Sequence, residues 1–160
     1  MVDIAAARGI VTPRDKQAMA YLVNRTELTV EWGHCDPAGI VFNSRFFEYF
    51  DIGTWLLFEV ALGVKRSEIA EVFGIVGYPI VDAKARFIAP VKFGDRIEIA
   101  SIVTEFRRSS FDVEHRISNQ GQIAAEGNET RVWVGRNPDN PAQLRSQPIP
   151  ADVIARFGRS

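Results

Sequence analysis

The residues best suited to chemistry lie in one short segment, Gly33-His-Cys-Asp-Pro-Ala-Gly-Ile-Val41. Proline fixes the backbone φ angle and glycine tolerates positive φ, so the segment is expected to form a tight turn. A stretch with helical spacing follows it, which would put the Asp36 carboxylate beside a helix N-terminus. Unpaired N–H groups there can polarise a carbonyl, while a carboxylate attacks or activates water. The segment outlines acyl-transfer chemistry, although Asp-Pro-x-Gly is also typical of a turn whose aspartate merely caps a helix.

Three other reactive side chains have a plainer interpretation. His34 could tune the neighbouring carboxylate, but a histidine at a strand end more often makes a local hydrogen bond. Cys35 is the only cysteine and has no clear helix-start position that would activate it, so we expect it to pack as a small side chain. His115 falls on the apolar face of its segment, which favours a hydrogen-bonded core histidine.

The elements around the turn have two different periods. Leu28, Val30 and Trp32 alternate with polar residues, which predicts a half-buried strand. From Asn43 to Leu62 the apolar residues recur at three- and four-residue steps, which predicts one long, largely buried helix. Asn43 or Ser44 is expected to cap its first turn, and Gly63 to form a left-handed cap at its end.

Downstream of Gly77 the period is two again. Four strands are expected, over Val81–Ala89, Arg96–Arg107, Phe111–Ser118 and Ile123–Arg136. The connections are too short for repeated helical crossovers, so the α+β chain is expected to pack an antiparallel meander against one core helix. Short helices are expected over Lys65–Phe73 and Ala151–Phe157, and Asn137–Pro141 is expected to be a loop. Residues 1–24 are expected to form an N-terminal arm, either a short helix or disordered, and residues 25–160 the domain.

Composition and charge exclude several classes of protein. The chain has 160 residues, of which 46% are hydrophobic and 24% charged, as is typical of one soluble globular domain. Its formal charge of −1 gives no field to hold a nucleic-acid backbone. The most apolar stretch, Trp55–Leu62, is far shorter than the about 20 residues of a membrane span, and the N-terminus lacks a secretory pattern. A single cysteine makes no disulfide or metal cluster, so we expect a cytoplasmic protein without nucleic-acid or membrane partners.

Over most of its length the sequence resembles the 4-hydroxybenzoyl-CoA thioesterase family of hotdog-fold proteins. Four segments carry the resemblance at near-constant spacing between residues 26 and 157: Cys35-Asp-Pro-Ala-Gly-Ile-Val41, Gly74-Ile-Val-Gly-Tyr-Pro-Ile-Val81, Glu105-Phe-Arg-Arg-Ser-Ser-Phe111 and Ile149-Pro-Ala-Asp152. The resemblance implies the hotdog fold, in which a curved antiparallel sheet of about five strands wraps around one long central helix. This agrees with the strand and helix pattern deduced from the residues.

The resemblance also implies catalytic groups. Asp36 matches the family's catalytic carboxylate, which acts as nucleophile or as general base; both roles need an ionised carboxylate and remain open. The backbone N–H of Asn43 matches the donor that polarises the thioester carbonyl. A tyrosine occupies that position in the aromatic-acyl enzyme, but a backbone donor does not need that side chain. No metal or other cofactor is implied.

Other matches concern the acyl group. Asp51 lies where the 4-hydroxyl of the acyl ring is bound, and burying its charge among aromatic neighbours would require a partner or a ligand hydroxyl. Phe42 replaces a tryptophan and Tyr78 a threonine, so the substrate-binding wall differs. The aromatic stripe of Phe46, Phe50, Trp55 and Phe58 is expected to be core first and pocket wall second.

For the CoA nucleotide, Arg107 and Arg108 match residues that contact its phosphates, and the planar guanidinium fork suits that contact. Ser109 replaces a lysine there. Without the resemblance, two arginines in a turn would simply be solvated charges.

The implied function is an acyl-CoA thioesterase acting on an aromatic, 4-hydroxybenzoyl-like acyl group. Two alternatives stay open: a thioesterase for short aliphatic or phenylacetyl-type groups, and a non-catalytic acyl-CoA-binding hotdog module. A hotdog dehydratase is disfavoured, because the sequence shows no obvious hydration motif in which a histidine is paired with a carboxylate. One helix on one sheet leaves an edge and part of the pocket open, so a homodimer or homotetramer with active sites at subunit interfaces is expected.

Overall fold

The computed structural model describes residues 21–158 of the chain. Residues 1–20, which make up most of the expected N-terminal arm, lie outside the described part. The elements are β1 (Val23–Thr29), the 3₁₀ turn η2 (Trp32–His34), α1 (Asn43–Leu62), α2 (Arg66–Phe73), β2 (Ile80–Phe87), β3 (Arg96–Phe106), β4 (Ser110–Asn119), β5 (Gln122–Val132), β6 (Val134–Arg136), β7 (Leu144–Ser146) and α3 (Ala151–Ala155). None of the helices in residues 21–158 has the length and apolar character that a membrane crossing demands.

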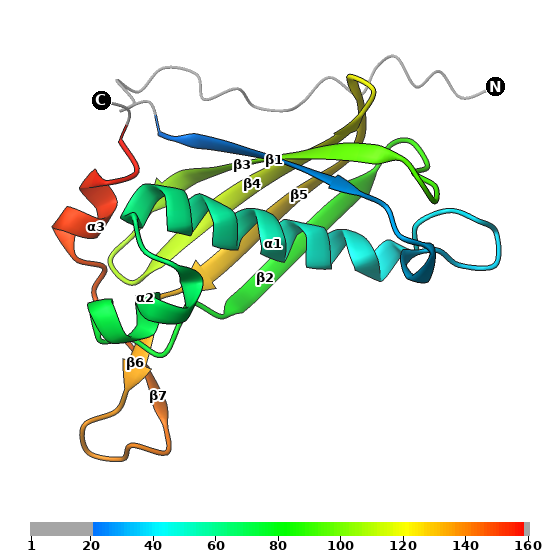
Figure 1. The fold of residues 1–160 in the computed structure, drawn as a ribbon. Helices are drawn as coiled ribbons and strands as arrows, with labels where there is room; N and C mark the ends of the chain where they lie inside the picture. Colours follow the sequence, from blue (N-terminus) through cyan, green and yellow to red (C-terminus); the bar gives the residue numbers. More distant parts are fainter. Residues whose placement is uncertain (1–20, 159–160) are drawn as a thin grey trace.

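The five long strands form one antiparallel sheet in the order β1-β3-β4-β5-β2. The sheet curves around α1, which lies across one of its faces (Figure 1). The expected hotdog arrangement of a curved sheet around one long helix is therefore confirmed.

The prediction of a meander is wrong for the outer strands. Only β3, β4 and β5 follow one another, whereas β1 pairs with β3 at one edge and β2 with β5 at the other. The segment between β2 and β3 carries the chain across the sheet, and Val91 is buried within it. Its backbone is bonded at both ends: the N–H groups of Ile88 and Ala89 donate to the Ala124 carbonyl, and the Asp95 carbonyl accepts from Val30.

The central helix α1 has the bounds that its apolar stripe predicts. Gly63 ends it in the left-handed conformation with φ 70°, as expected. Its start differs from the prediction, because Phe42 occupies the N-cap and no side chain of residues 21–158 caps the first turn. Gly53 lets the helix approach the sheet closely, since a Cβ atom there would lie 2.3 Å from the Ser101 Oγ.

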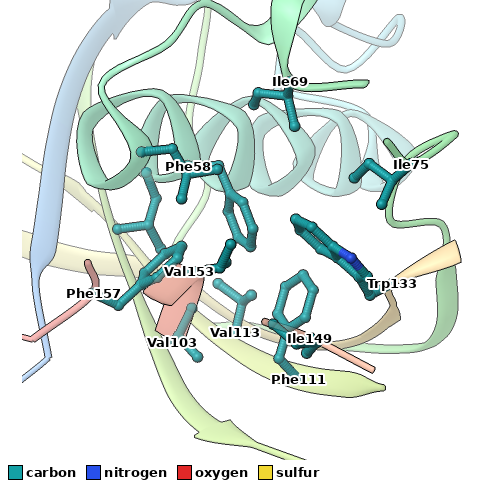
Figure 2. Close-up of a cluster of buried hydrophobic side chains, with 12 residues drawn as sticks. Phe58, Ile69, Ile75, Val103, Phe111, Val113, Trp133, Ile149, Val153 and Phe157 are labelled. Carbon is teal, nitrogen blue, oxygen red and sulfur yellow. The ribbon is translucent and has the colours of Figure 1, made fainter. Parts of the chain in front are cut away.

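Two buried clusters fill the space between helix and sheet. One lies under the second half of α1 and includes Phe58, Phe111, Trp133 and Phe157, which point toward one another from the helix, the sheet and the C-terminal segment (Figure 2). The other lies under the first half of α1 around Phe50. The expected short helices form at α2 and α3. The helix α3 packs against the first cluster.

Two predicted strands have different bounds in the structure. The first strand ends at Thr29, and Trp32 is 73% exposed in η2 rather than alternating into the core. The last strand is broken at Trp133, after which β6 turns away from the sheet and pairs with β7, a strand that the sequence did not predict. The residues between β6 and β7 include the expected loop Asn137–Pro141.

The strand β2 leaves one edge of the sheet open within the described residues. Its apolar side chains are poorly covered: Val81 is 62% and Phe87 46% exposed, and Ile80 and Ile88 at its ends are also exposed. A register shift between Ile80 and Asp82 marks an irregularity at Val81. An unpaired strand edge with exposed apolar residues is typical of a surface that pairs with another chain.

Candidate active site

The Asp36 turn has the conformation that its residue types favour. The Asp36 N–H donates to the Ile40 carbonyl, and Gly39, with φ 78°, returns an N–H to the Asp36 carbonyl. The carboxylate accepts a hydrogen bond from the Ala38 N–H at 2.8 Å through Oδ1. No partner of Oδ2 is found among residues 21–158, so one carboxylate oxygen can meet a substrate or a water molecule.

The turn leads directly into the start of α1. The Phe42 N–H donates to the His34 carbonyl at 2.9 Å, which fixes the entry angle of the helix. The N–H groups of Asn43 and Ser44 have no acceptor within the described part of the chain. The carboxylate and the start of the helix thus belong to one hydrogen-bonded segment, and the Asn43 N–H can polarise a carbonyl oxygen.

The two residues before Asp36, His34 and Cys35, have local roles, as expected. The His34 Nδ1 accepts hydrogen bonds from the Glu31 N–H at 3.2 Å and from the Tyr49 hydroxyl at 2.9 Å. Burial raises the pKa of Tyr49 to about 12, so it stays a neutral donor. Cys35 packs against the apolar cluster around Phe50. His34 therefore braces the loop against α1.

A cavity of about 470 Å³ opens further along α1. Its wall combines aromatic, aliphatic and charged side chains from α1, α2, the segment before β2 and the strands β2, β5, β6 and β7. It is lined by Asp51, Trp55, Arg66, Ile69, Ala70, Val76, Gly77, Tyr78, Pro79, Ile80, Arg131, Val134 and Leu144. Asp51 and Tyr78, two of the predicted substrate-binding residues, meet here. Phe42, the third, is 53% exposed at the start of α1 and does not line this cavity.

Asp51 has the partner that its burial required. Its Oδ1 accepts a hydrogen bond from the Arg131 Nη2 at 2.7 Å, and the Asp51 side chain is 32% exposed. The Tyr78 ring stacks on Phe58 with the centroids 4.4 Å apart. Desolvation raises the pKa of Tyr78 to about 12, so the cavity wall holds a neutral phenol beside an ion pair.

The sequence did not predict the buried polar cluster behind this ion pair. The Glu129 Oε2 accepts hydrogen bonds from the Arg131 Nε at 2.9 Å and the Thr54 Oγ1 at 3.1 Å. The His115 Nε2 lies 3.3 Å from the same oxygen, and its Nδ1 lies 2.8 Å from the Ser101 Oγ. A signal was present in the sequence, because residues 129 and 131 share the face of their strand with the buried Ala125 and Gly127.

Burial and charge set the protonation of this cluster. Desolvation alone would raise the pKa of Glu129, but the hydrogen bonds and charges of His115 and Arg131 outweigh it and hold that pKa below its usual 4.5. Burial lowers the pKa of His115 below its usual 6.5, although Glu129 opposes the shift. The cluster therefore holds a neutral imidazole, an ionised glutamate and an arginine, and the expectation of a hydrogen-bonded core histidine is confirmed.

The neutral His115 predicts a loss of stability in mild acid. Below about pH 6.5 the unfolded chain binds a proton at this histidine and the folded chain does not, so the free energy of unfolding falls as pH falls. The loss is up to about 1.4 kcal/mol per pH unit, and it is absent above the unfolded pKa. Urea unfolding at about pH 7.5 and about pH 5.5 measures it, with His115→Gln as the control whose stability depends less on pH. Equal slopes for the two proteins would contradict a neutral buried imidazole.

The three residues expected to bind CoA follow β3 in its turn to β4. The Arg107 guanidinium is already engaged: it donates to Asp112 at 2.9 Å, to Glu105 at 2.9 Å and to the Ser110 Oγ at 2.9 Å. The hydrogen bond from Arg107 holds the pKa of Asp112 below its usual value. For the exposed Arg108 guanidinium, no ion pair or hydrogen bond is found within residues 21–158. The Ser109 carbonyl accepts from the Trp133 N–H, which fixes the turn.

The Asp36 loop and this turn lie at opposite ends of the sheet (Figure 1). The bridge between Ile40 and Lys92 sets the Asp36 turn beside the residues that precede β3, whereas Arg107 follows the last residue of β3. β3 runs from Arg96 to Phe106, which at about 3.3 Å per residue separates its ends by roughly 33 Å. The predicted site residues therefore form three groups in one chain: the Asp36 loop, the cavity and the β3–β4 turn.

The described residues contain no group of side chains suited to binding a metal ion. Within residues 21–158 no three histidine, cysteine, aspartate or glutamate side chains are grouped to hold a metal ion.

The sequence and the fold are both similar to those of known thioesterases. The chain is 32% identical over 131 residues to the 4-hydroxybenzoyl-CoA thioesterase of Pseudomonas sp. strain CBS-3, which covers 78% of this chain and 90% of that enzyme. The solved structure of that enzyme superposes with a TM-score of 0.76 at 28% identity, over 86% of this chain and 99% of the other. The structure of a gentisyl-coenzyme A thioesterase superposes with a TM-score of 0.69 at 33% identity, over 84% and 98% of the two chains.

A family profile extends the agreement to most of the domain. The profile of the thioesterase-like superfamily matches residues 30–157, from the end of the first strand to the C-terminal helical segment. By family, the chain is therefore a thioester hydrolase that belongs to the thioesterase-like superfamily.

Proposed function

We propose that this protein hydrolyses an aromatic acyl-CoA thioester of the 4-hydroxybenzoyl type to the free acid and CoA. The observation that carries the proposal is the Asp36 carboxylate, which has one oxygen without a partner among residues 21–158, in the loop that ends at the start of α1. Two relatives are named for hydroxylated benzoyl esters, 4-hydroxybenzoyl-CoA and gentisyl-CoA. The aromatic and charged wall of the cavity, with Asp51 and Tyr78, suits an acyl ring of this kind.

Two routes fit the geometry. In both, the Asn43 N–H donates to the thioester oxygen and stabilises the negative charge that develops on it. As a base, Asp36 takes a proton from water while the water oxygen attacks the carbonyl carbon; the carbon–sulfur bond breaks, and the thiolate of CoA takes up the proton. As a nucleophile, Asp36 attacks the carbon itself and expels the thiolate, and water then hydrolyses the mixed anhydride.

A complete site needs two copies of the chain in this proposal. One chain keeps Asp36 and Arg108 roughly 33 Å apart, at opposite ends of β3. Pairing of two copies through the open edge of β2 would bring these ends together. In an antiparallel β2–β2 pair, the end of one sheet that carries Asp36 lies beside the end of the other sheet that carries Arg108. The exposed Val81, Phe87 and Ile88 would be covered by that pairing. The active form is thus a homodimer, or a homotetramer built from such dimers.

CoA recognition in this proposal depends mainly on Arg108. Arg108→Ala is expected to raise KM for a full CoA ester about 10- to 150-fold, since a hydrogen bond to a charged group contributes about 1.5–3 kcal/mol. The effect on kcat is expected to be smaller, and a truncated thioester without the nucleotide should not respond. Steady-state kinetics with both esters measures the change.

Arg107→Ala is the matched control in the same turn. Arg107 is hydrogen-bonded to Asp112, Glu105 and Ser110, so its loss is expected to lower the melting temperature. Its effect on KM is expected to be smaller than that of Arg108→Ala. If neither variant changed KM for the full CoA ester, both arginines would be solvated turn charges and the phosphate contact would be refuted.

The acyl group is tested by steady-state hydrolysis of a panel of esters. We expect kcat/KM to be highest for 4-hydroxybenzoyl-CoA among benzoyl-, 4-hydroxybenzoyl-, phenylacetyl-, butyryl- and octanoyl-CoA. A maximum at phenylacetyl- or butyryl-CoA would keep the thioesterase but refute its aromatic hydroxylated substrate. Binding of all the esters without release of free CoA would point instead to a non-catalytic acyl-CoA-binding module.

A further inference from the structure

One wall of the cavity is charged, and a buried residue behind it holds its arginine in place. Arg131 lines the cavity, yet its side chain is only 4% exposed and Glu129 behind it is fully buried. A buried ion pair contributes little net stability compared with apolar side chains of the same volume. Stability alone therefore gives no reason for a pair of charges at this point of the core.

The hydrogen bonds of the Arg131 guanidinium leave its Nη1 largely free to bind a ligand. Its Nε and Nη2 donate to the Glu129 Oε2 at 2.9 and 2.8 Å, and Nη2 also donates to the Asp51 Oδ1 at 2.7 Å. The only acceptor of Nη1 within the described residues is the Tyr78 carbonyl, at a weak 3.5 Å. Asp51 likewise has no partner for Oδ2 there. The wall thus holds one weakly used N–H donor and one carboxylate acceptor, on two side chains that are hydrogen-bonded to each other.

That combination suits a hydroxyl group. A hydroxyl oxygen can accept from the Arg131 Nη1 while its proton is donated to the Asp51 Oδ2. A carboxylate substituent would bring a second negative charge to Asp51, and an unsubstituted ring would leave both groups without a partner after water is excluded. A substituent that both donates and accepts is the one that satisfies this wall.

The buried cluster supplies the rigidity that such selectivity needs. Glu129 is held by Thr54 and by His115, whose other ring nitrogen meets Ser101. The Phe50 ring stacks on the His115 imidazole with centroids 5.0 Å apart. With these side chains fully or almost fully buried, the guanidinium has little freedom to turn.

We infer that Arg131 is a specificity-determining residue that, with Asp51, selects an acyl ring carrying a hydroxyl, and that Glu129 and His115 are positioning residues acting through it. The inference rests on the proposed aromatic acyl-CoA substrate and adds the residues that discriminate within that class. It makes Arg131, which the sequence did not single out, as important for selectivity as Asp51.

The test is the ratio of kcat/KM for 4-hydroxybenzoyl-CoA to that for benzoyl-CoA, two esters that differ only in the hydroxyl. The wild-type ratio is expected to be about 10 or more, because a site built to pair a hydroxyl discriminates against the ring that lacks it. Arg131→Lys keeps the positive charge beside Glu129 but loses the planar fork, so the ratio is expected to fall about tenfold. General damage to the site would lower both rates and leave the ratio alone.

A second variant covers the case in which Arg131→Lys folds poorly. The double variant Glu129→Gln/Arg131→Gln removes both charges of the buried pair together, so no fully buried charge is left without a partner; Asp51, which loses its bond to Arg131, is 32% exposed and can be solvated. The double variant is expected to lower the ratio by about the same factor. Arg25→Lys is the matched control, since Arg25 also pairs with a glutamate on a neighbouring strand but is exposed, and it is expected to keep the wild-type ratio.

The outcomes separate this inference from the proposed function. Equal wild-type rates on the two esters, or an unchanged ratio in both the Arg131→Lys and the double variant, would overturn the inference while leaving the thioesterase intact. A wild-type preference for a 4-carboxybenzoyl ester would also overturn it. Failure to hydrolyse either ester would refute the proposed function and the inference with it.

Discussion

Replacing Asp36 with asparagine is expected to lower kcat for an aromatic acyl-CoA by about 100-fold or more, the range lost with a general base. The amide oxygen can still accept the hydrogen bond from the Ala38 N–H, so the turn keeps its shape. The amide cannot attack the thioester or take a proton from water. We therefore expect KM for the ester and the melting temperature to change little. Steady-state kinetics and thermal unfolding of the two proteins measure the difference.

The same substitution at Asp139 provides the control. Asp139 lies in the loop between β6 and β7, well away from the start of α1, so Asp139→Asn is expected to leave kcat unchanged. A loss below about tenfold in Asp36→Asn, which is about 1.4 kcal/mol of transition-state stabilisation, would exclude Asp36 as the catalytic carboxylate. If the loss is large, oxygen-18 found in the wild-type protein after a single turnover in labelled water would favour the anhydride route, because water that attacks the Asp36 carbonyl of the anhydride leaves its oxygen on the protein.

The helix α1 and the Asp36 turn were predictable because local rules determine them. The stripe that begins near Phe46 gives α1 its helical period, and Gly63 ends the helix where left-handed backbone is needed. The turn at Asp36 follows from proline and glycine within four residues. These features depend on neighbours in sequence, so a single sequence is enough to place them.

The order of the strands depends on contacts that no local pattern encodes. β2 has the alternation expected of a strand, but the alternation cannot specify which strand it pairs with. The buried Val91 and the bonds of Ile88 and Ala89 to the Ala124 carbonyl direct the chain across the sheet. Alternation in β2 favours burial of one face, but its apolar side chains are exposed. Such exposure is typical of a strand that forms an interface with another chain.

The buried cluster was missed for a related reason. In sequence, Glu129 and Arg131 look like ordinary strand charges, and Asp51 looks like a carboxylate in need of a partner. Arg131 lies 80 residues from Asp51, and only the pairing of β4 with β5 beneath α1 brings His115 toward Glu129. A partner for Asp51 could be predicted from the cost of burying its charge, but the identity of that partner could not.

Activity is also expected to return when two inactive chains are mixed. Asp36→Asn removes the carboxylate, and Arg108→Glu reverses the charge at the β3–β4 turn and repels the CoA phosphates. In a mixed dimer whose sites draw Asp36 from one copy and Arg108 from the other, one site carries both defects and the second carries neither. Equal mixing makes half of the dimers mixed, so recovery of roughly a quarter of wild-type activity is expected.

The measurement that tests the central claim most directly is the rate of CoA release from 4-hydroxybenzoyl-CoA, below the wild-type KM, by co-refolded Asp36→Asn and Arg108→Glu chains. Each variant alone provides the baseline, and light scattering of the wild-type chain at micromolar concentration establishes whether it is a dimer or larger. A site shared between two copies predicts that the mixture recovers roughly a quarter of the wild-type rate, far above either variant. A mixture no more active than its two components, or a wild-type chain that is a fully active monomer, would contradict the shared site.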